Sequence, residues 1–228
     1  CQVTVKNQSQ LFESINLNRA AGLSRLNEVT EQVFNLSYSE DNGMFSEHLI
    51  LFAAIAQSKV KISSILEIGT FDGRTAVILG KLFPQAIVTT IDLPDGSSEF
   101  IDTYERNKSH SDFVIRRNDV LSSVPNIKFK QVNSLWLANW VESFDLIWID
   151  GAHGYPVVPM DIINSYRLCN KGGFVLIDDI FVTVNNSDSY YKSVGGFETL
   201  TALKVSKLIT DFILFNKRGN HRHTMCYS

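Results

Sequence analysis

A short segment of the chain, residues 67–75, combines two glycines with two carboxylates in the sequence Glu-Ile-Gly-Thr-Phe-Asp-Gly-Arg-Thr. An apolar run precedes this segment and a helical pattern follows it, so it is expected to join a strand to a helix. Gly69 and Gly73 allow a tight turn and let a ligand approach the backbone closely. The segment is therefore a candidate ligand-binding loop, although a glycine-containing turn that binds nothing would have the same pattern.

The charges and glycine spacing of this loop bear on what it could bind. A dinucleotide-binding loop follows the pattern G-x-G-x-x-G, but here Phe71 takes the middle glycine position, and the chain contains no Gly-Lys-Ser or Gly-Lys-Thr that a P-loop needs. Glu67 and Asp72 would repel a pyrophosphate, whereas they suit S-adenosylmethionine, which carries an ammonium and a sulfonium group and no phosphate. Asp92 could accept hydrogen bonds from the ribose of either ligand.

A second group of residues could hold a metal ion or accept a proton. Asp150 follows one apolar run, and Asp178 and Asp179 follow another. If the two strands are neighbours, the three carboxylates converge without a basic partner and repel one another unless a divalent cation is present. Oxygen ligands of this kind suit Mg²⁺ or Ca²⁺. His153 is a candidate general base, because imidazole can accept a hydroxyl proton near neutral pH.

Each of these interpretations has a simpler alternative. Asp178 or Asp179 could cap the following loop, and Asp150 could contact only a cofactor. His153 could hydrogen-bond only to the backbone. The residues alone leave these alternatives open.

The elements that position these residues alternate in type from residue 62 onward. Apolar runs predict strands at residues 62–68, 87–91, 127–132, 144–149, 174–177, 208–216 and 224–227. Helical patterns predict helices at residues 74–83, 98–108, 111–122 and 157–169, the last closed by Gly172 and Gly173. This alternation predicts an α/β fold with a mainly parallel sheet. The last two strands are joined too closely for a crossover and must form an antiparallel hairpin.

Nearly every strand that is expected to be parallel ends in a polar or acidic residue. These residues are Glu67, Asp92, Asn133, Asp150 and Asp178. Ligands of open α/β sheets bind outside the carboxyl ends of the strands, so the five side chains should line one crevice. The polar segment at residues 181–197 is long enough to be a loop that covers or walls such a crevice.

Several of these segments resemble a known family. Residues 66–76 are similar to motif I of class I S-adenosylmethionine-dependent methyltransferases, and the Glu-Ile-Gly-Thr opening is similar to the small-molecule O-methyltransferase branch. Residues 149–155 and 171–179 resemble a branch that includes macrocin-type enzymes. The resemblance covers roughly residues 45–228. It implies a Rossmann-like, seven-stranded sheet of order 3-2-1-4-5-7-6 with helices on both faces.

The resemblance also implies roles for residues in the binding of S-adenosylmethionine. Thr75 would bond the methionine carboxylate and Asp92 would hold the ribose. Asn133 stands where the family usually has Asp in the motif that flanks adenine, which is a departure. The full set of expected cofactor-binding residues is Glu67, Gly69, Thr70, Phe71, Gly73, Thr75, Asp92, Leu93, Asn133, Ser134 and Asp150.

For catalysis, the resemblance implies His153 and Asp150 as the central residues. Metal-dependent relatives hold an ion at positions matching Asp150, Asp178 and Asp179, where it chelates the substrate hydroxyl and lowers its pKa. In catechol-type relatives the last ligand is often Asn, and the base is often Lys where this chain has His153. The acceptor would be a small molecule.

Composition and charge exclude several other functions. The chain is 44% hydrophobic and 20% charged, which is ordinary for a globular protein, and its net charge of −3 predicts no nucleic-acid partner. The longest apolar run, residues 49–56, is too short to cross a membrane. Three cysteines without C-x-x-C spacing favour a cytoplasmic location. We expect one domain, residues 1–228, with a helical region at 1–60 that is able to form a homodimer contact and a core at 61–228.

Three functions are compatible with these patterns. The first is methyl transfer from S-adenosylmethionine to a hydroxyl of a small molecule, with or without a metal. The second is an NAD-dependent oxidoreductase, which Phe71 and the missing third glycine disfavour. The third is a binding module that has kept the fold without catalysis, since fold alone does not determine function.

Overall fold

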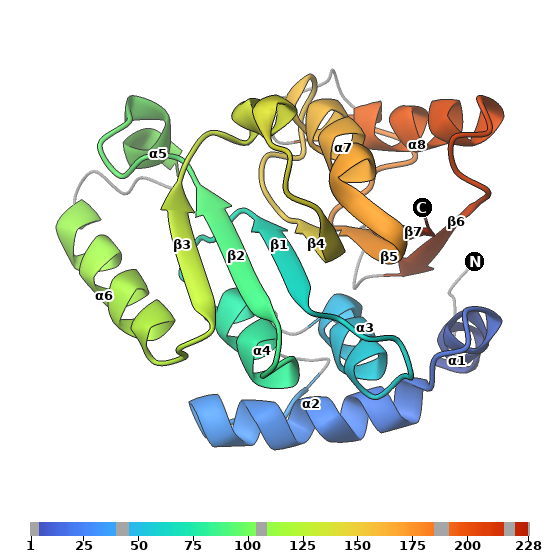
Figure 1. Ribbon diagram of the computed structural model, residues 1–228, viewed down its shortest axis with the longest axis horizontal. Helices are drawn as coiled ribbons and strands as arrows, with labels where there is room; N and C mark the ends of the chain where they lie inside the picture. The colour runs from blue at the N-terminus through green and yellow to red at the C-terminus, as the bar shows by residue number, and fades with distance from the viewer. Residues whose placement is uncertain (1–4, 40–45, 104–108, 185–191, 217–221, 228) are drawn as a thin grey trace.

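The computed structural model describes residues 5–39, 46–103, 109–184, 192–216 and 222–227, which form a layered α/β structure around a twisted sheet (Figure 1). The strands are β1 (Ser64–Ile68), β2 (Ile87–Asp92), β3 (Ile127–Gln131), β4 (Phe144–Ile149), β5 (Cys169–Ile177), β6 (Phe212–Asn216) and β7 (Arg222–Tyr227). Their order across the sheet is β3-β2-β1-β4-β5-β7-β6. Strands β1 to β5 pair in parallel, whereas β7 is antiparallel to both β5 and β6. The expected α/β class and mainly parallel sheet are confirmed.

Helices cover both faces of this sheet. They are α1 (Val5–Ser14), α2 (Arg19–Phe34), α3 (Glu47–Ala56), α4 (Arg74–Leu82), α5 (Ser98–Asp102), α6 (His110–Ser122), the 3-10 helix η2 (Ser134–Asn139), α7 (Val157–Leu168) and α8 (Gly195–Val205). Helices α3 and α4 lie on one face, with α2 beneath them, and α7 and α8 lie on the other (Figure 1).

The sheet is apolar on both faces, as expected for parallel strands that helices cover on each side. In β4, Trp148 is fully buried in the core that includes α3, whereas its neighbours Ile147 and Ile149 are fully buried in the core that includes α7. This burial on two faces fixes the direction and register of β4. The carboxyl end of the strand, where Asp150 follows, is therefore held rigidly.

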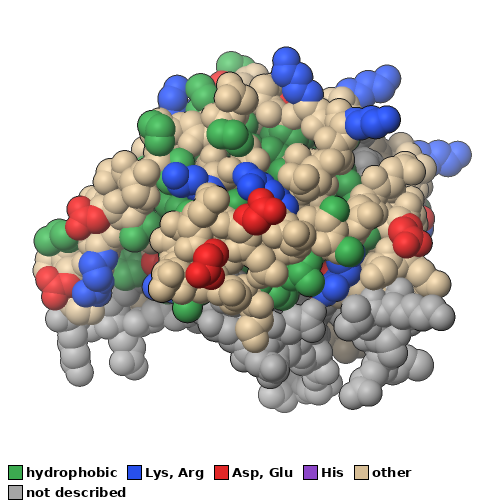
Figure 2. All heavy atoms as spheres, turned by 90° about the horizontal axis from the view of Figure 1, so that it is seen from below, with side chains coloured by type: hydrophobic (Ala, Val, Ile, Leu, Met, Phe, Trp, Pro, Cys, Tyr) green, Lys and Arg blue, Asp and Glu red, His purple; other side chains and the backbone are tan. Residues whose placement is uncertain are grey.

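The N-terminal helices pack directly against the core. Gly22 of α2 lies so close to α3 that a Cβ at this position would be 2.7 Å from the carbonyl oxygen of Ile50. A buried ion pair joins the first residues of the two helices, since Arg19 Nε lies 2.6 Å from Glu47 Oε1. Figure 2 shows the molecule from this side, with basic and acidic side chains scattered among neutral and hydrophobic ones.

The start of β5 corrects the predicted end of α7. We expected Gly172 and Gly173 to close that helix, but α7 ends at Leu168 and β5 begins at Cys169. The pairing of β4 with β5 shifts register after Phe144. Gly173 permits this irregularity, because a Cβ there would lie 2.7 Å from the carbonyl oxygen of Asp145.

Helix α8 was not predicted from the sequence. It begins inside the segment that we expected to be a loop, and consecutive glycines at its start, Gly195 and Gly196, obscure the helical pattern. Gly196 packs closely against Ile180, since a Cβ there would lie 2.8 Å from Ile180 Cδ1. The predicted turn at residues 217–220 lies outside the described residues. Within the described part of the chain, no helix is long and apolar enough to span a membrane.

Candidate active site

A cavity of about 410 Å³ opens at the carboxyl ends of the central parallel strands. The predicted site residues that line it are Gly69, Phe71, Asp92, Leu93, Asn133, Ser134, Asp150 and His153. The predicted site residues that do not line it are Glu67, Thr70, Gly73, Thr75, Asp178 and Asp179. The structure thus brings residues from four separate loops into one crevice, as the polar strand ends predicted, but several motif residues lie behind its wall.

Much of the cavity wall is apolar and was not predicted. The main additional lining residues are Ile68, Ile91, Phe100, Thr103, Val132, Leu135, Gly151, Ala152 and Val157. Phe100 and Thr103 come from α5 and the residue after it, where the sequence shows only a polar helical pattern. Leu135 lies on η2, a helix that no sequence pattern predicted. Val132 and Gly151 lie close after strand ends, where the sequence offered a signal, whereas Phe100 and Thr103 do not.

Position 69 requires glycine because the backbone of the loop after β1 contacts the backbone of the loop after β4 here. The φ of Gly69 is +101°, and a Cβ here would lie 2.2 Å from the carbonyl oxygen of Asp150. Its N–H donates to the carbonyl of Ile91, and the N–H of Asp150 donates to the carbonyl of Ile68. The loop after β1 therefore packs directly on the loops after β2 and β4. Gly73 serves packing in the same way, since its φ is +82° and a Cβ would meet Leu121 at 2.9 Å.

Asp92 at the end of β2 organises the adjoining loops. Its Oδ2 accepts the N–H of Phe71 at 2.9 Å and its Oδ1 accepts the N–H of Leu93 at 2.8 Å. Phe71 has a φ of +47°, an uncommon value for a residue with a Cβ. A carboxylate has about four acceptor positions, so Asp92 can anchor two loops and still accept a further hydrogen bond from a ligand in the cavity.

Glu67 is fully buried behind the loop instead of facing the cavity. Thr90 Oγ1 donates to Glu67 Oε2 at 2.5 Å, and Thr90 Oγ1 and Thr70 Oγ1 are 2.6 Å apart. Either threonine hydroxyl can be the donor in the second contact, so the three side chains form a buried hydrogen-bonded chain. Burial raises the pKa of Glu67 well above its usual value, the Thr90 hydroxyl opposes this, and the charges of Asp150, Asp92 and Asp72 add to it. Glu67 thus holds the loop after β1 in place through Thr90 and Thr70, on the side away from the cavity.

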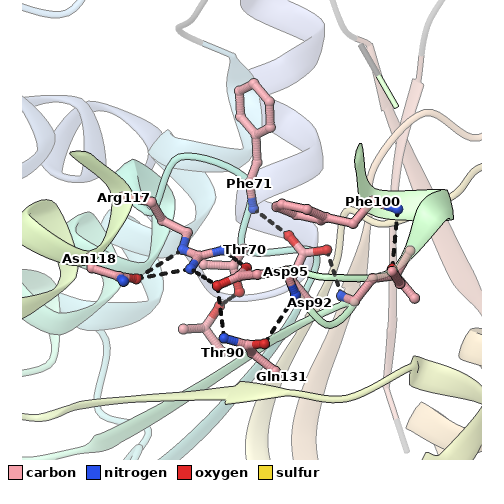
Figure 3. A network of polar contacts seen from close by, with 11 residues as sticks. Thr70, Phe71, Thr90, Asp92, Asp95, Phe100, Arg117, Asn118 and Gln131 are labelled. Carbon is pink, nitrogen blue, oxygen red and sulfur yellow. Dashed lines mark hydrogen bonds and ion pairs between the residues drawn. The ribbon is translucent and has the colours of Figure 1, made fainter. Parts of the chain in front are cut away.

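A buried ion pair secures the loop after β2 (Figure 3). Arg117 of α6 has a fully buried side chain, and its Nη1 and Nη2 lie 2.7 Å and 2.9 Å from Asp95 Oδ1 and Oδ2. The guanidinium stacks over Phe129 at 4.3 Å and also donates to Asn118. Gln131 donates to Asp95 and accepts its N–H. These contacts hold the segment that leads from Asp92 to the cavity-lining helix α5.

Asn133 begins η2 at the far wall of the cavity. Its Oδ1 accepts the N–H of Leu135 at 3.0 Å, which places Ser134 and Leu135 on the cavity wall. An Asp at this position would accept the same hydrogen bond. The departure from the family pattern at residue 133 therefore leaves the shape of this wall unchanged.

His153 and Asp150 face each other at the cavity. His153 Nε2 lies 3.6 Å from Asp150 Oδ1, and the two side chains are 16% and 32% exposed. Burial alone would lower the pKa of His153, but the contact with Asp150 and its charge, together with the charges of Asp179 and Asp178, outweigh burial and raise the pKa above 6.5. The separation is longer than a good hydrogen bond.

The predicted metal site is not formed by the side chains. In the part of the chain that the structure describes, no three His, Cys, Asp or Glu residues are arranged to hold a metal ion. Asp178 is buried and its Oδ1 accepts the N–H of Asp179 at 2.8 Å, while Asp179 has a φ of +48°. The prediction assumed that the carboxylates lack a basic partner. His153 provides one, since the charges of all three act on it.

Comparison with known proteins assigns the family. A model described as a methyltransferase domain matches residues 66–180, half of the chain. The chain belongs to this methyltransferase family. No curated protein matches this methyltransferase-domain chain significantly.

Solved structures similar to this methyltransferase-domain protein share its fold at low sequence identity. A putative O-methyltransferase from Klebsiella pneumoniae is 17% identical with a TM-score of 0.54, and 97% of each chain is covered. The N-methyltransferase NodS from Bradyrhizobium japonicum WM9, in complex with S-adenosyl-l-homocysteine, is 14% identical with a TM-score of 0.55; 90% of this chain and 98% of NodS are covered.

A third similar structure is longer than this chain. It is an O-methyltransferase family protein from Burkholderia thailandensis, 11% identical with a TM-score of 0.52. The match covers 78% of this chain and 55% of that protein, so this chain spans about half of its length. Both O- and N-methyltransferases are therefore among the proteins that share the fold.

Proposed function

We propose that this protein transfers a methyl group from S-adenosylmethionine to a hydroxyl group of a small molecule, with His153 as the general base. The observation that carries the proposal is the convergence of Asp92, Asp150 and His153 on one cavity. The family assignment supplies the reaction class. The geometry supports a role for each of the three residues.

The cavity suits the donor in size and chemistry. Its volume of about 410 Å³ lies in the range of roughly 300–1,000 Å³ that is usual for small-molecule sites. Asp92 would accept the ribose hydroxyls, and the apolar walls formed by Leu93, Phe100 and Leu135 would hold the adenine. Asp150 would favour the positively charged sulfonium and ammonium groups at the other end. When bound, S-adenosylmethionine supplies a methyl group by direct displacement and leaves as S-adenosylhomocysteine.

His153 would accept the proton of the acceptor hydroxyl. His153 lines the cavity, its Nε2 lies 3.6 Å from Asp150 Oδ1, and its side chain is mostly enclosed yet still 16% exposed. A hydroxyl oxygen within roughly 3 Å of Nε2 could transfer its proton as it attacks. Asp150 then stabilises the imidazolium that results. Because positioning accounts for much of the acceleration of a direct displacement, the rigid loops around Asp92 and Asp150 are part of the machinery.

The oxidoreductase alternative is less compatible with the site. Phe71 occupies the position where a dinucleotide fold has its second glycine, and its side chain is 43% exposed at the cavity rim. Arg117, the buried cation behind the loop after β2, is engaged by Asp95 and Asn118. It is therefore not positioned to neutralise a phosphate.

The experiment that tests the proposed function is a product assay. The purified protein is incubated with S-adenosylmethionine and a panel of small phenols, catechols and sugars, and S-adenosylhomocysteine formation is measured. We expect acceptor-dependent product with the native protein and at least a hundredfold less with His153→Ala. Product that forms equally with His153→Ala would refute the role of His153. The absence of product with every acceptor, despite S-adenosylhomocysteine binding, would favour a binding module.

A further inference from the structure

Asp161 is a fully buried acidic residue that does not line the cavity. It lies on α7, its side chain is 0% exposed, and neither carboxylate oxygen has a hydrogen bond of good geometry among the described residues, although the Ser134 hydroxyl is close enough to act on its pKa. A buried carboxylate without partners is costly to the fold. A residue that lowers the stability of the fold and has no structural role is a candidate for a role in function.

Asp161 lies against the loop that carries His153. A Cβ added at Gly151 would be 3.7 Å from Asp161 Oδ2, so the carboxylate lies close to the backbone of this loop. The same loop is tied to the start of α7, because the N–H of Val158 donates to the carbonyl of Gly154 at 3.1 Å. Asp161 and His153 are therefore attached to one compact unit of structure.

The electrostatics link the same two side chains. Burial raises the pKa of Asp161 to about 7, while the nearby Ser134 hydroxyl and the charge of His153 lower it in part. The Nδ1 atom of His153 is buried and has no hydrogen-bond partner among the described residues, whereas its Nε2 faces Asp150. The charge of His153 thus acts on Asp161, and the buried Nδ1 of His153 and the buried carboxylate of Asp161 each have no geometrically well-formed hydrogen bond among the described residues.

We propose that Asp161 is a positioning residue for His153. Its carboxylate pairs with the Nδ1 side of the imidazole, while Nε2 accepts the substrate proton. This inference rests on the proposed function. Nε2 must be unprotonated to act as the base, so the remaining ring proton has to be on Nδ1. A carboxylate on that side selects this tautomer and stabilises the cation formed when the proton arrives.

A simpler interpretation is that Asp161 belongs to a row of buried polar side chains on α7 that buried water molecules satisfy. Asn164 Nδ2 and Ser165 Oγ lie one turn further along the buried face of α7 and also have no partner among the described residues. Buried water commonly satisfies such groups. In that case Asp161 would have no influence on His153. The two readings differ in what the substitution of Asp161 does to the imidazole.

The substitution Asp161→Asn separates these readings without the need for an acceptor. It keeps the size of the side chain and removes its charge. The measurement is an NMR titration of the His153 imidazole signal, assigned with His153→Gln, in the native protein and the variant. Other charges that act on His153, those of Asp150, Asp179 and Asp178, are the same in both. We expect the pKa of His153 to fall by half a unit or more, and an unchanged pKa would overturn the proposal.

Stability and turnover complete the test. Because the carboxylate has no hydrogen bond of good geometry among the described residues, Asp161→Asn should fold with an unchanged or higher Tm, should bind S-adenosylhomocysteine within about twofold of the native affinity, and should lose about tenfold or more of its turnover. Ser165→Ala, on the same buried face, is the matched control and should retain turnover and the pKa of His153. A lower Tm with normal turnover for Asp161→Asn would mean that the residue is purely structural.

The failure of this proposal is distinguishable from failure of the proposed function. If the native protein transfers no methyl group, the reaction assignment fails while the NMR titration still reports on the Asp161–His153 pair. If the native protein is active and Asp161→Asn has the native turnover, only the positioning role fails.

Discussion

The guanidinium of Arg117 and the carboxylate of Asp95 form a bidentate ion pair, with distances of 2.7 Å and 2.9 Å, at the back of the loop that runs from Asp92 to α5. Arg117 comes from α6 and Asp95 from the β2–α5 connection, so the pair fixes one wall of the cavity to a helix on the outside of the sheet. Its side chains are 0% and 19% exposed.

Substitution of Arg117 by Met should weaken cofactor binding more than it changes turnover at saturation. Loss of one partner of a buried pair costs roughly 3–5 kcal/mol of stability, and the freed loop no longer presents Phe100 correctly. We expect a lower Tm and an affinity for S-adenosylhomocysteine about tenfold weaker by calorimetry. Lys204→Met is the matched control, since Lys204 forms an equally short but exposed ion pair with Asp211 at 2.7 Å. Equal effects of the two variants would contradict the assigned role.

Gly69→Ala should be severely destabilising, because the added Cβ would lie 2.2 Å from the backbone oxygen of Asp150. Gly172 offers a control with a similar φ of +79° but no atom within 4 Å of an added Cβ. The conformational cost alone, roughly 1 kcal/mol, should apply at Gly172, and at least about 3 kcal/mol should be lost at Gly69. Denaturant unfolding measures both, and similar losses would show that the loops do not pack as described.

The polar ends of the parallel strands could be identified from the sequence because they depend on local patterns. Alternation of apolar and helical runs located Asp92 and Asp150, and glycine spacing located the loop at Gly69. By contrast, the reason for Gly69 is a contact with the loop after β4, about eighty residues away in the chain. No local pattern contains that information.

Residues that depend on tertiary packing were missed or assigned wrongly. The metal prediction for Asp150, Asp178 and Asp179 did not take into account His153, on which the charges of all three carboxylates act. Asp161 looks like an ordinary helical carboxylate in the sequence, and only its burial in the structure marks it. Arg117 is fully buried against Asp95, and no local pattern in the sequence indicates this burial.

The rate of methyl transfer should rise with pH through the pKa of His153. A general base works in its neutral form, and the contact with Asp150 and its charge raises the pKa of His153 above 6.5. The acidic limb of the turnover profile should therefore have its midpoint above pH 6.5. His153→Gln should remove this limb from whatever activity remains. A midpoint well below pH 6.5 would show that another group accepts the proton.

Chelation of divalent cations should leave turnover unchanged within about twofold. Among the described residues, Asp150, Asp178 and Asp179 do not form a group arranged to hold a metal ion, so the proposed role of His153 as base does not depend on a metal-bound acceptor hydroxyl. The measurement compares turnover after dialysis against EDTA with turnover after addition of Mg²⁺. A loss on dialysis that Mg²⁺ restores would contradict this expectation.

The most direct test of the proposed function is calorimetric titration of the purified protein with S-adenosylhomocysteine, with NAD as the control ligand and Asp92→Ala as the control variant. We predict micromolar binding of S-adenosylhomocysteine, no detectable binding of NAD, and binding at least tenfold weaker in Asp92→Ala. Binding of NAD without binding of S-adenosylhomocysteine to the folded protein would contradict the assignment of this cavity as the methyl-donor site.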